Sequence, residues 1–202
     1  MIEWPMTPLT PVTLTGPTIT LEPLTPDHHD GLADAVRDGA LWNLWYTSVP
    51  DPEGMAAEIS RRLALQEQGA MLPFALRRNH TGQLLGMTTY CNIDPDTPRV
   101  EIGYTWNRES VQGTGTNPES KLLLLTHAFD VLGCTAVEFR THWMNHQSRE
   151  AIARLGAKQD GVLRAHRQGP DGSLRDTVVF SIIAAEWPMV RAGLEHRVAK
   201  TR

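Results

Sequence analysis

The sequence predicts one α/β domain in which a mostly antiparallel sheet is flanked by helices. Three strand-like segments follow one another at 71–78, 84–93 and 99–106, and turn signals separate them, which favours an antiparallel meander. A strongly apolar segment at 121–132 follows the meander and predicts a helix. A chain of 202 residues is long enough to bury a substantial core within one domain.

The segments before the meander predict an arm, a strand and two helices. Residues 1–17 contain prolines at positions 5, 8, 11 and 17, so we expect an irregular arm that lies on the domain or reaches a partner. Residues 18–24 alternate between polar and apolar and predict a strand. Helices are expected at about 25–38 and 53–68, where apolar residues recur at helical spacing.

The segments after the meander predict three helical segments, a further strand and a hairpin. Gly133 suits the C-cap of the apolar helix, and Asn145 suits the N-cap of the next helix. The expected elements are a helix at 118–132, a strand at 135–143, a helix at 145–155, two strands at 161–168 and 174–183 around the turn Gly169-Pro170-Asp171-Gly172, and a helix-compatible segment at 186–202. We therefore predict a domain at 18–187, preceded by the arm and followed by a tail at 188–202.

Composition excludes several classes of protein. Hydrophobic residues make up 41% of the chain and charged residues 21%, as in ordinary soluble domains. The net charge of −4 argues against broad nucleic-acid affinity. Cys91 and Cys134 fit no metal or redox spacing, and a reduced cytoplasmic setting is expected. The sequence shows neither a signal peptide nor an apolar run near the roughly 20 residues that a membrane span needs, so no membrane association is expected.

The segment 112–117 lies between the third strand of the meander and the apolar helix. Gly113 and Gly115 permit positive φ angles and close approach of a ligand to the backbone. Asn117 suits the N-cap position, and Pro118 then occupies the first helical position. The free N–H groups and the positive dipole end of a helix start favour an anion, most naturally a phosphate. Lys121 either adds charge to this site or is an ordinary solvated helix lysine.

The glycines of this segment fit neither of two common nucleotide-binding patterns. There is no Gly-x-x-x-x-Gly-Lys-Ser/Thr sequence, and Asn117 and Pro118 break the Gly-x-Gly-x-x-Gly pattern. Taken alone, the segment is more typical of an ordinary glycine turn than of a phosphate site.

Three motifs in order resemble the GCN5-related N-acetyltransferases. Gln112-x-x-Gly115-x-Asn117 resembles the Gln/Arg-x-x-Gly-x-Gly/Ala pyrophosphate loop of that family, with Asn117 as the departure. The segment 101–106, Glu-Ile-Gly-Tyr-Thr-Trp, resembles the fourth strand of the branch that acetylates ribosomal proteins, the RimJ/RimL-like branch. The segment 145–157 resembles the Asn-x-x-Ser-x-x-Ala-Ile-x-x-Leu-Gly helix. The similar segments together extend from about 18 to 187.

The resemblance implies a fold and an activity. The fold would be a mixed, mostly antiparallel, twisted sheet flanked by helices. The activity would be direct transfer of acetyl from acetyl-CoA to a primary amine, either a protein N-terminus or a small molecule, without a metal ion or a covalent enzyme intermediate. A homodimer is expected because relatives often pair. The alternatives are a catalytically inactive acyl-CoA-binding module and a partner-binding protein of the same fold.

The resemblance also implies which residues hold acetyl-CoA. Main-chain groups at 104–106 would pair with the pantetheine arm and polarise the thioester carbonyl, although Trp106 is equally compatible with core packing. Asn145 and Ser148 would contact the pantetheine amide and the sulfur end, besides serving as the N-cap and third residue of a helix. The predicted cofactor-binding residues are Tyr104, Thr105, Trp106, Gln112, Gly113, Thr114, Gly115, Thr116, Asn117, Lys121, Asn145 and Ser148.

The predicted catalytic residues are Glu101 and Ser148. Glu101 would accept the proton of the amine, directly or through water, or it is a strand carboxylate paired with an arginine. Ser148 would protonate the departing thiolate, although a thiol of pKa about 8.5 barely needs an acid.

The acceptor site is predicted near an aromatic segment and a histidine. Trp42 and Trp45 either line a substrate cleft or pack between two helices. His142 is a possible acceptor-site residue. His142 and His146 are four residues apart, but a helix start between them breaks the geometry of a helical His-x-x-x-His site, so no metal is expected.

Overall fold

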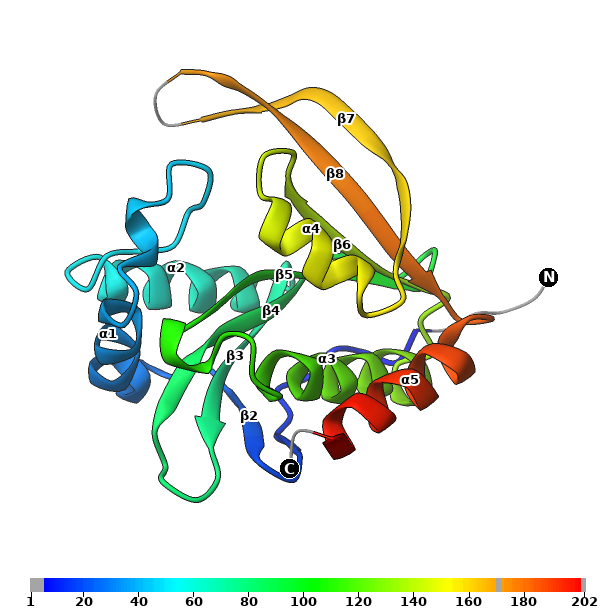
Figure 1. Cartoon of the computed structure of the whole chain (residues 1–202), viewed down its shortest axis with the longest axis horizontal. Helices are drawn as coiled ribbons and strands as arrows, with labels where there is room; N and C mark the ends of the chain where they lie inside the picture. The colour runs from blue at the N-terminus through cyan, green and yellow to red at the C-terminus, as the bar shows by residue number, and fades with distance from the viewer. Residues whose placement is uncertain (1–5, 170–171, 201–202) are drawn as a thin grey trace.

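The computed structural model describes residues 6–169 and 172–200, and a single sheet runs through its centre (Figure 1). Within the described residues, eight strands lie in the order β1-β2-β3-β4-β5-β6-β8-β7. Their bounds are β1 Leu14–Thr15, β2 Ile19–Pro23, β3 Met71–Arg78, β4 Leu84–Asp94, β5 Arg99–Asn107, β6 Ala136–His142, β7 Lys158–Gln168 and β8 Leu174–Ile183. Neighbouring strands are antiparallel except β5 and β6, which are parallel. The mixed, mostly antiparallel sheet and the meander of β3, β4 and β5 are confirmed.

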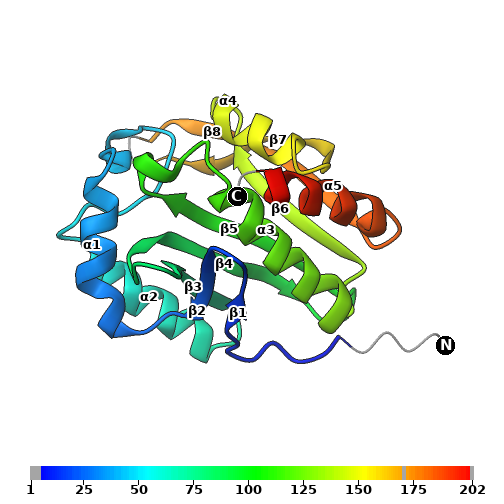
Figure 2. The same ribbon diagram turned by 60° about the horizontal axis from the view of Figure 1, so that its bottom comes forward.

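Helices cover both faces of the sheet. The helices are α1 His29–Arg37, α2 Met55–Glu67, α3 Thr116–Thr126, α4 His146–Ala153 and α5 Trp187–Lys200, with short helical turns η1 Pro26–His28, η2 Leu41–Asn43, η3 Glu109–Val111 and η4 His127–Val131. Figures 1 and 2 show α1 and α2 grouped together, with α3 and α5 lying side by side away from them. One apolar cluster joins α3, α4 and α5 to the sheet, and a second cluster joins α1 and α2 to it. The two clusters define two faces, which matter below for the site.

Helix α3 begins earlier than the sequence predicted. Gly115 is its N-cap, with φ −71, so Asn117 and Pro118 are the second and third residues of the helix and the assignment of Asn117 as N-cap is wrong. Proline is tolerated there because the N–H groups of a first turn have no partner within the helix. The positive φ is found at Gly113, at +73°, and not at Gly115. The predicted C-terminal glycine is confirmed, since Gly133 has φ +72°.

A buried carboxylate ties the start of α3 to the edge of the sheet. Glu119 is 2% exposed and accepts hydrogen bonds from the N–H groups of Thr18, at 2.8 Å, and Ile19, at 3.1 Å. The Thr18 hydroxyl donates to the other carboxylate oxygen. Because these bonds join residues 100 positions apart, the loop that precedes α3 is held against a fixed strand.

Both ends of the described chain pack on the core. Met6, Leu9 and Val12 lie against the first cluster without regular structure, but the arm predicted to be irregular also contains β1, which pairs with β2. The predicted C-terminal helix is α5, which buries Val190, Leu194 and Val198. The proposed domain limits remain predictions. Pro170 and Asp171, in the predicted hairpin turn, lie outside the described residues, although β7 and β8 flank that turn.

Two further observations concern the cysteines and the helices. Cys91 and Cys134 are both buried free thiols. Among the described residues, no helix combines the length and the apolar character that crossing a membrane demands.

Candidate active site

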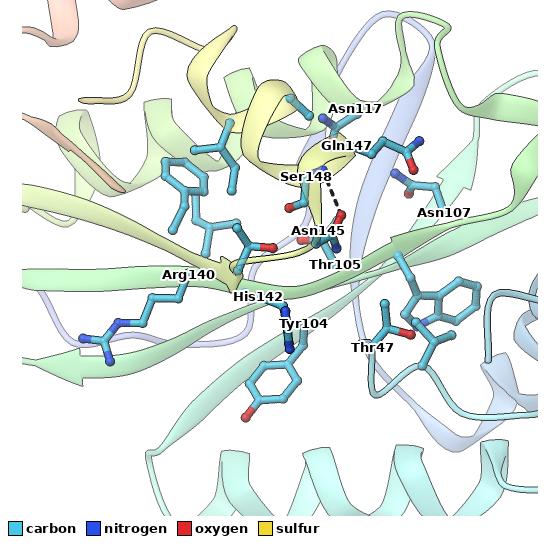
Figure 3. A pocket seen from close by; sticks show the side chains of 18 of the residues that line it. Thr47, Tyr104, Thr105, Asn107, Asn117, Arg140, His142, Asn145, Gln147 and Ser148 are labelled. Atoms are coloured by element: carbon cyan, nitrogen blue, oxygen red, sulfur yellow. Dashed lines mark hydrogen bonds between the residues drawn. The ribbon is translucent and has the colours of Figure 1, made fainter. Parts of the chain in front are cut away.

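The site lies where the sheet divides. Strands β5 and β6 pair only through Arg99–Glu101 and Ala136–Glu138 among the described residues. Beyond that point β5 continues beside β4 to Asn107, and β6 continues beside β8 to His142. The second half of β5 therefore has a backbone edge without a neighbouring strand. A cavity of about 650 Å³, within the size range of ligand pockets, is lined by this edge, by the loop before α3 and by α4 (Figure 3).

A bulge shapes that free edge of β5. The register with β4 shifts between Met87 and Thr89, and Tyr104 has φ +50°. The Arg62 guanidinium, 2% exposed, donates to the carbonyl oxygen of Tyr104 at 3.2 Å and to the Thr89 hydroxyl at 2.7 Å. Glu58 holds the same guanidinium at 2.7 Å. An ion pair within α2 thus fixes the strained backbone that faces the cavity.

The loop before α3 offers unpaired main-chain donors. The N–H groups of Gly113, Thr114, Gly115 and Asn117 donate to no group in the described part of the chain. The Thr114 side chain turns back and donates to the Val111 carbonyl at 2.7 Å, which stabilises the turn. These amides lie at the start of an eleven-residue helix, where the sequence analysis placed an anion site, and that role remains a prediction.

The lining of the cavity includes most of the predicted loop, but not all of it. Gln112, Gly113, Thr114, Asn117 and Lys121 line the cavity, whereas Gly115 and Thr116 do not. Gln112 donates to the Asn107 carbonyl at 3.1 Å, and its side-chain oxygen accepts from Gln147 at 3.1 Å. The loop is therefore bridged to α4 across the cavity. Sequence analysis missed Gln147 because a surface glutamine within a helix carries no local signal.

Helix α4 supplies Asn145 and Ser148. The Asn145 side chain accepts from the Ser148 N–H at 3.0 Å, which confirms the predicted N-cap and the third helical position (Figure 3). Both residues also line the cavity. The Ser148 hydroxyl has no hydrogen-bond partner among the described residues, so it is available to a ligand.

Lys121 is not a solvated helix lysine. It is 5% exposed, and its Nζ lies 2.9 Å from the Thr105 hydroxyl and 3.4 Å from the Thr88 hydroxyl. Burial without a carboxylate partner lowers the pKa of Lys121 to about 7. Its amine lines the cavity next to β5, and at neutral pH it carries only part of a charge.

Glu101 lines the cavity from β5 and is 7% exposed. Its carboxylate accepts a 2.5 Å hydrogen bond from Asn92, and the Arg140 guanidinium lies 3.6 Å away. Burial raises the pKa of Glu101, and the charge of Arg140 opposes that rise. The carboxylate lines the cavity, as a proton acceptor for the amine would, and it also has an arginine partner, as a structural strand carboxylate would.

The predicted acceptor residues take different places. Trp106, which was predicted to bind the cofactor and not the acceptor, is 5% exposed, belongs to the second apolar cluster and also lines the cavity. Trp42 is partly buried against the same cluster and does not line the cavity. Trp45 is 63% exposed, which excludes core packing, and its ring contacts that of His142 at 5.2 Å. His142 lines the cavity, as does Tyr46, which the sequence analysis did not single out.

His142 ends β6 and His146 begins α4, so the two histidines lie on different elements. Helix α4 begins at His146, which confirms the helix start between the two histidines. The His142 ring accepts a hydrogen bond from the Met144 N–H at 3.0 Å. The pKa of His142 lies below its ordinary value, mainly because of burial. In the described part of the chain, no three His, Cys, Asp or Glu side chains gather where they could hold a metal ion.

The cavity has one group of residues on each side of the divided sheet. Figure 3 shows Asn117, Asn145 and Ser148 on one side of the strands, and His142 and Tyr104 on the other. The first group accompanies the loop before α3, and the second group lies toward α2. An elongated ligand entering past the loop would therefore pass through the gap between β5 and β6 to reach Glu101.

Comparison with known proteins identifies the family. Residues 18–158 match the family model described as the acetyltransferase (GNAT) domain. The chain belongs to this family. The family resemblance and the fold predicted from it are therefore confirmed.

A curated relative points in the same direction. YdaF of Bacillus subtilis (strain 168), whose name proposes ribosomal N-acetyltransferase activity, is 30% identical over 108 residues. The match covers 54% of this chain and 58% of YdaF, so it spans little more than half of that relative's length.

Solved structures share the fold over nearly the whole chain. A GCN5-related N-acetyltransferase from Brucella melitensis superposes with a TM-score of 0.87 at 25% identity, covering 98% of this chain and 90% of that one. Mycobacterium smegmatis RimJ, solved in complex with CoA-disulfide, has a TM-score of 0.77 at 23% identity and covers 98% of both chains. At that identity, the likeness to RimJ shows the fold alone.

Proposed function

We propose that this chain transfers an acetyl group from acetyl-CoA directly to a primary amine. One observation carries the proposal: a single cavity is lined by the loop with free amides, by the unpaired edge of β5 and by the buried carboxylate of Glu101. Membership of the acetyltransferase family supports it.

The residues present fit the phosphate and pantetheine parts of coenzyme A. Free N–H groups between Gly113 and Asn117 suit phosphate oxygens. The β5 edge at Tyr104, Thr105 and Trp106 offers main-chain groups to an arm that itself contains amides, in the way that an edge strand accepts an added strand. Asn145 and Ser148 face this edge from α4 across the cavity. We propose that Lys121 mainly positions Thr105 through its contact with the hydroxyl, and that its charge contributes less to binding.

Three groups of the chain would perform the chemistry. When bound, acetyl-CoA would supply the acetyl group as a thioester. A main-chain N–H of the segment 104–106 would stabilise the negative charge that develops on the carbonyl oxygen. The Ser148 hydroxyl would donate a proton toward the sulfur, directly or through water. Glu101 would accept the proton of the attacking amine, and the buried setting that raises its pKa makes it a better proton acceptor.

The acceptor is proposed to be a primary amine of a protein N-terminus or a small molecule. The name given to YdaF supports N-terminal peptides of ribosomal proteins as first candidates. A homodimer and a cytoplasmic location remain predictions from the sequence.

The test is a thiol-release screen with acetyl-CoA and a panel of amines, combined with calorimetric titration of CoA. We expect CoA binding together with amine-dependent thiol release. CoA binding without thiol release across the panel would instead assign an inactive acyl-CoA-binding module. Absence of both would overturn the assignment of an acetyltransferase.

A further inference from the structure

Two arginines face each other on the β7–β8 hairpin without an acidic partner. Arg167 and Arg175 occupy directly opposed positions in the register of these strands, and both line the cavity. Among the described residues, no carboxylate forms an ion pair with either guanidinium, and no hydrogen bond satisfies either side chain. The Nε of Arg175 is buried and has no acceptor. Like charges opposed across two strands destabilise a sheet, so this arrangement needs an explanation.

Three other arginines that line the cavity each have a carboxylate partner. Arg62 is paired with Glu58 at 2.7 Å, and Arg140 with Glu138 at 2.8 Å. Arg154 lies 3.7 Å from Glu150. The only carboxylate among the described residues that line the cavity is Glu101, although the whole chain has a net charge of −4. The end of the cavity near Arg167 and Arg175 therefore has excess positive charge.

The arginine pair lies on the face of the sheet away from the loop before α3. Val178 and Phe180 of β8 point into the cluster beneath α3, α4 and α5. Because successive side chains of a strand alternate between faces, Arg175, three residues before Val178, points to the opposite face. Glu101 alternates in the same way with Val100 and Ile102 of β5. The arginines and Glu101 thus share the face toward α1 and α2. Phosphates held by the loop before α3 would not neutralise this pair.

The pKa shifts agree with a position of the arginine pair close to Glu101. Arg167 and Arg175 both act to lower the pKa of Glu101, against the effect of burial. The pKa of Arg175 is itself below its ordinary value, first because of burial and next because of Arg167. Since an arginine keeps its charge at any physiological pH, the Glu101 carboxylate offsets only part of the repulsion, and an incoming anion would relieve it further.

We propose that Arg167 and Arg175 form an anion subsite for a carboxylate of the acceptor, which carries its reacting amine close to Glu101. This inference rests on the proposed acetyltransferase function. A guanidinium pair suits a carboxylate because it donates several hydrogen bonds in a fixed plane. The acceptor class is then an amine with a carboxylate nearby, and two sources fit: the α-carboxylate of a free amino acid, or an acidic residue close to the N-terminus of a peptide.

Matched pairs of amines test the subsite and separate the two sources. One pair is alanine and alaninamide, and the other is Ala-Asp-amide and Ala-Asn-amide. For each pair, kcat/KM gives a preference for the carboxylate. Because the amine pKa also differs within a pair, the decisive number is the change in preference between the wild type and the variants R175Q and R167Q. We expect a loss of about tenfold in at least one pair. Loss in the first pair assigns a free amino acid, and loss in the second assigns an acidic peptide.

A binding measurement and a control variant complete the test. Calorimetric titration of the CoA-saturated protein with the same four amines should show the same change in preference as the kinetics. R191Q removes one positive charge from α5, whose Arg191 does not line the cavity, and should preserve the wild-type preference. Arg167 is exposed, so R167Q tests the idea even where R175Q fails to fold.

The outcomes separate this inference from the proposed function. Turnover of amines with a preference that R167Q and R175Q leave unchanged would overturn the subsite and keep the acetyltransferase. Arginine-dependent binding of the carboxylate amines without any turnover would keep the subsite and overturn the catalytic proposal.

Discussion

The two sides of the cavity are built in different ways. The loop before α3 presents main-chain amides, which depend on backbone conformation and tolerate many side chains. The opposite side depends on side chains that four separate strands bring together, with Glu101 from β5, Arg140 from β6, Arg167 from β7 and Arg175 from β8. Under the proposed function, the cosubstrate would therefore depend on backbone shape, whereas the choice of acceptor would depend on side chains. The following predictions test or sharpen this comparison.

The largest effect is expected for Glu101→Gln. Loss of a general base lowers kcat/KM by about 10²–10⁴-fold, while the affinity for acetyl-CoA stays unchanged. The loss should be greatest between the raised pKa of Glu101 and the amine pKa of about 8, because above that pH the amine is already free of its proton. Steady-state rates across pH check this. An unchanged pH–rate profile would remove Glu101 from the mechanism.

Lys121→Met should stabilise the fold at low pH. The folded-state pKa of about 7 lies below the unfolded value of 10.5, so the unfolded chain binds more protons between these values and wild-type stability rises with pH across that window. Below pH 7 the wild type must hold a charged, buried amine. The methionine variant should gain roughly 2–4 kcal/mol in the free energy of unfolding at pH 6, and this gain should shrink toward pH 10.

The two hydroxyls next to Lys121 make this substitution mild. Thr88 and Thr105 lie 2.8 Å from each other and can pair without the amine. Denaturant unfolding at several pH values is the measurement. A gain that does not vary with pH would show that Lys121 is protonated throughout.

Gly113→Val should weaken acetyl-CoA binding by roughly 10- to 100-fold. The residue has φ +73°, so a β-branched side chain is strained there and projects where the phosphates are expected. Gly82→Val is the matched control, because Gly82 has φ +72° and also has open space around it, but lies in the turn between β3 and β4. Both variants should lose similar stability, and only the first should lose affinity. If the Gly113→Val and Gly82→Val variants bound acetyl-CoA with equal affinity, the phosphates would have to lie elsewhere.

The smallest effect is expected for Gln147→Ala. This change removes the hydrogen bond to Gln112 that bridges the loop and α4 across the cavity. A bond of this kind contributes about 0.5–1.5 kcal/mol, so the affinity for CoA should fall about two- to tenfold with little change in kcat. Calorimetric titration is the measurement, and affinity equal to that of the wild type would show that the bridge does not order the loop.

Local signals in the sequence predicted much of the fold. The turns between β3, β4 and β5, the Asn145 cap and the C-terminal Gly133 each depend on neighbours in the chain, and each is confirmed. The start of α3 was misplaced by two residues because Asn117 and Pro118 are favourable at more than one position of a first turn.

Long-range contacts explain what the sequence did not predict. The sequence around Lys121 is compatible with a solvated helix lysine, but the fold places its amine next to the Thr105 hydroxyl. Arg62 carries no local signal either, and its role depends on α2 packing against the bulge of β5. The family resemblance implied an exposed backbone edge at 104–106, but the point at which pairing between β5 and β6 stops depends on distant segments, which no local pattern encodes. The unpaired state of Arg167 and Arg175 depends in the same way on the register of the hairpin.

A crystal structure with bound coenzyme A tests the central claim most directly. The account predicts diphosphate oxygens within hydrogen-bond distance of the main-chain N–H groups between Gly113 and Asn117, with the pantetheine arm alongside β5 at 104–106. A diphosphate bound elsewhere, with this loop occupied by side chains of the protein itself, would contradict it.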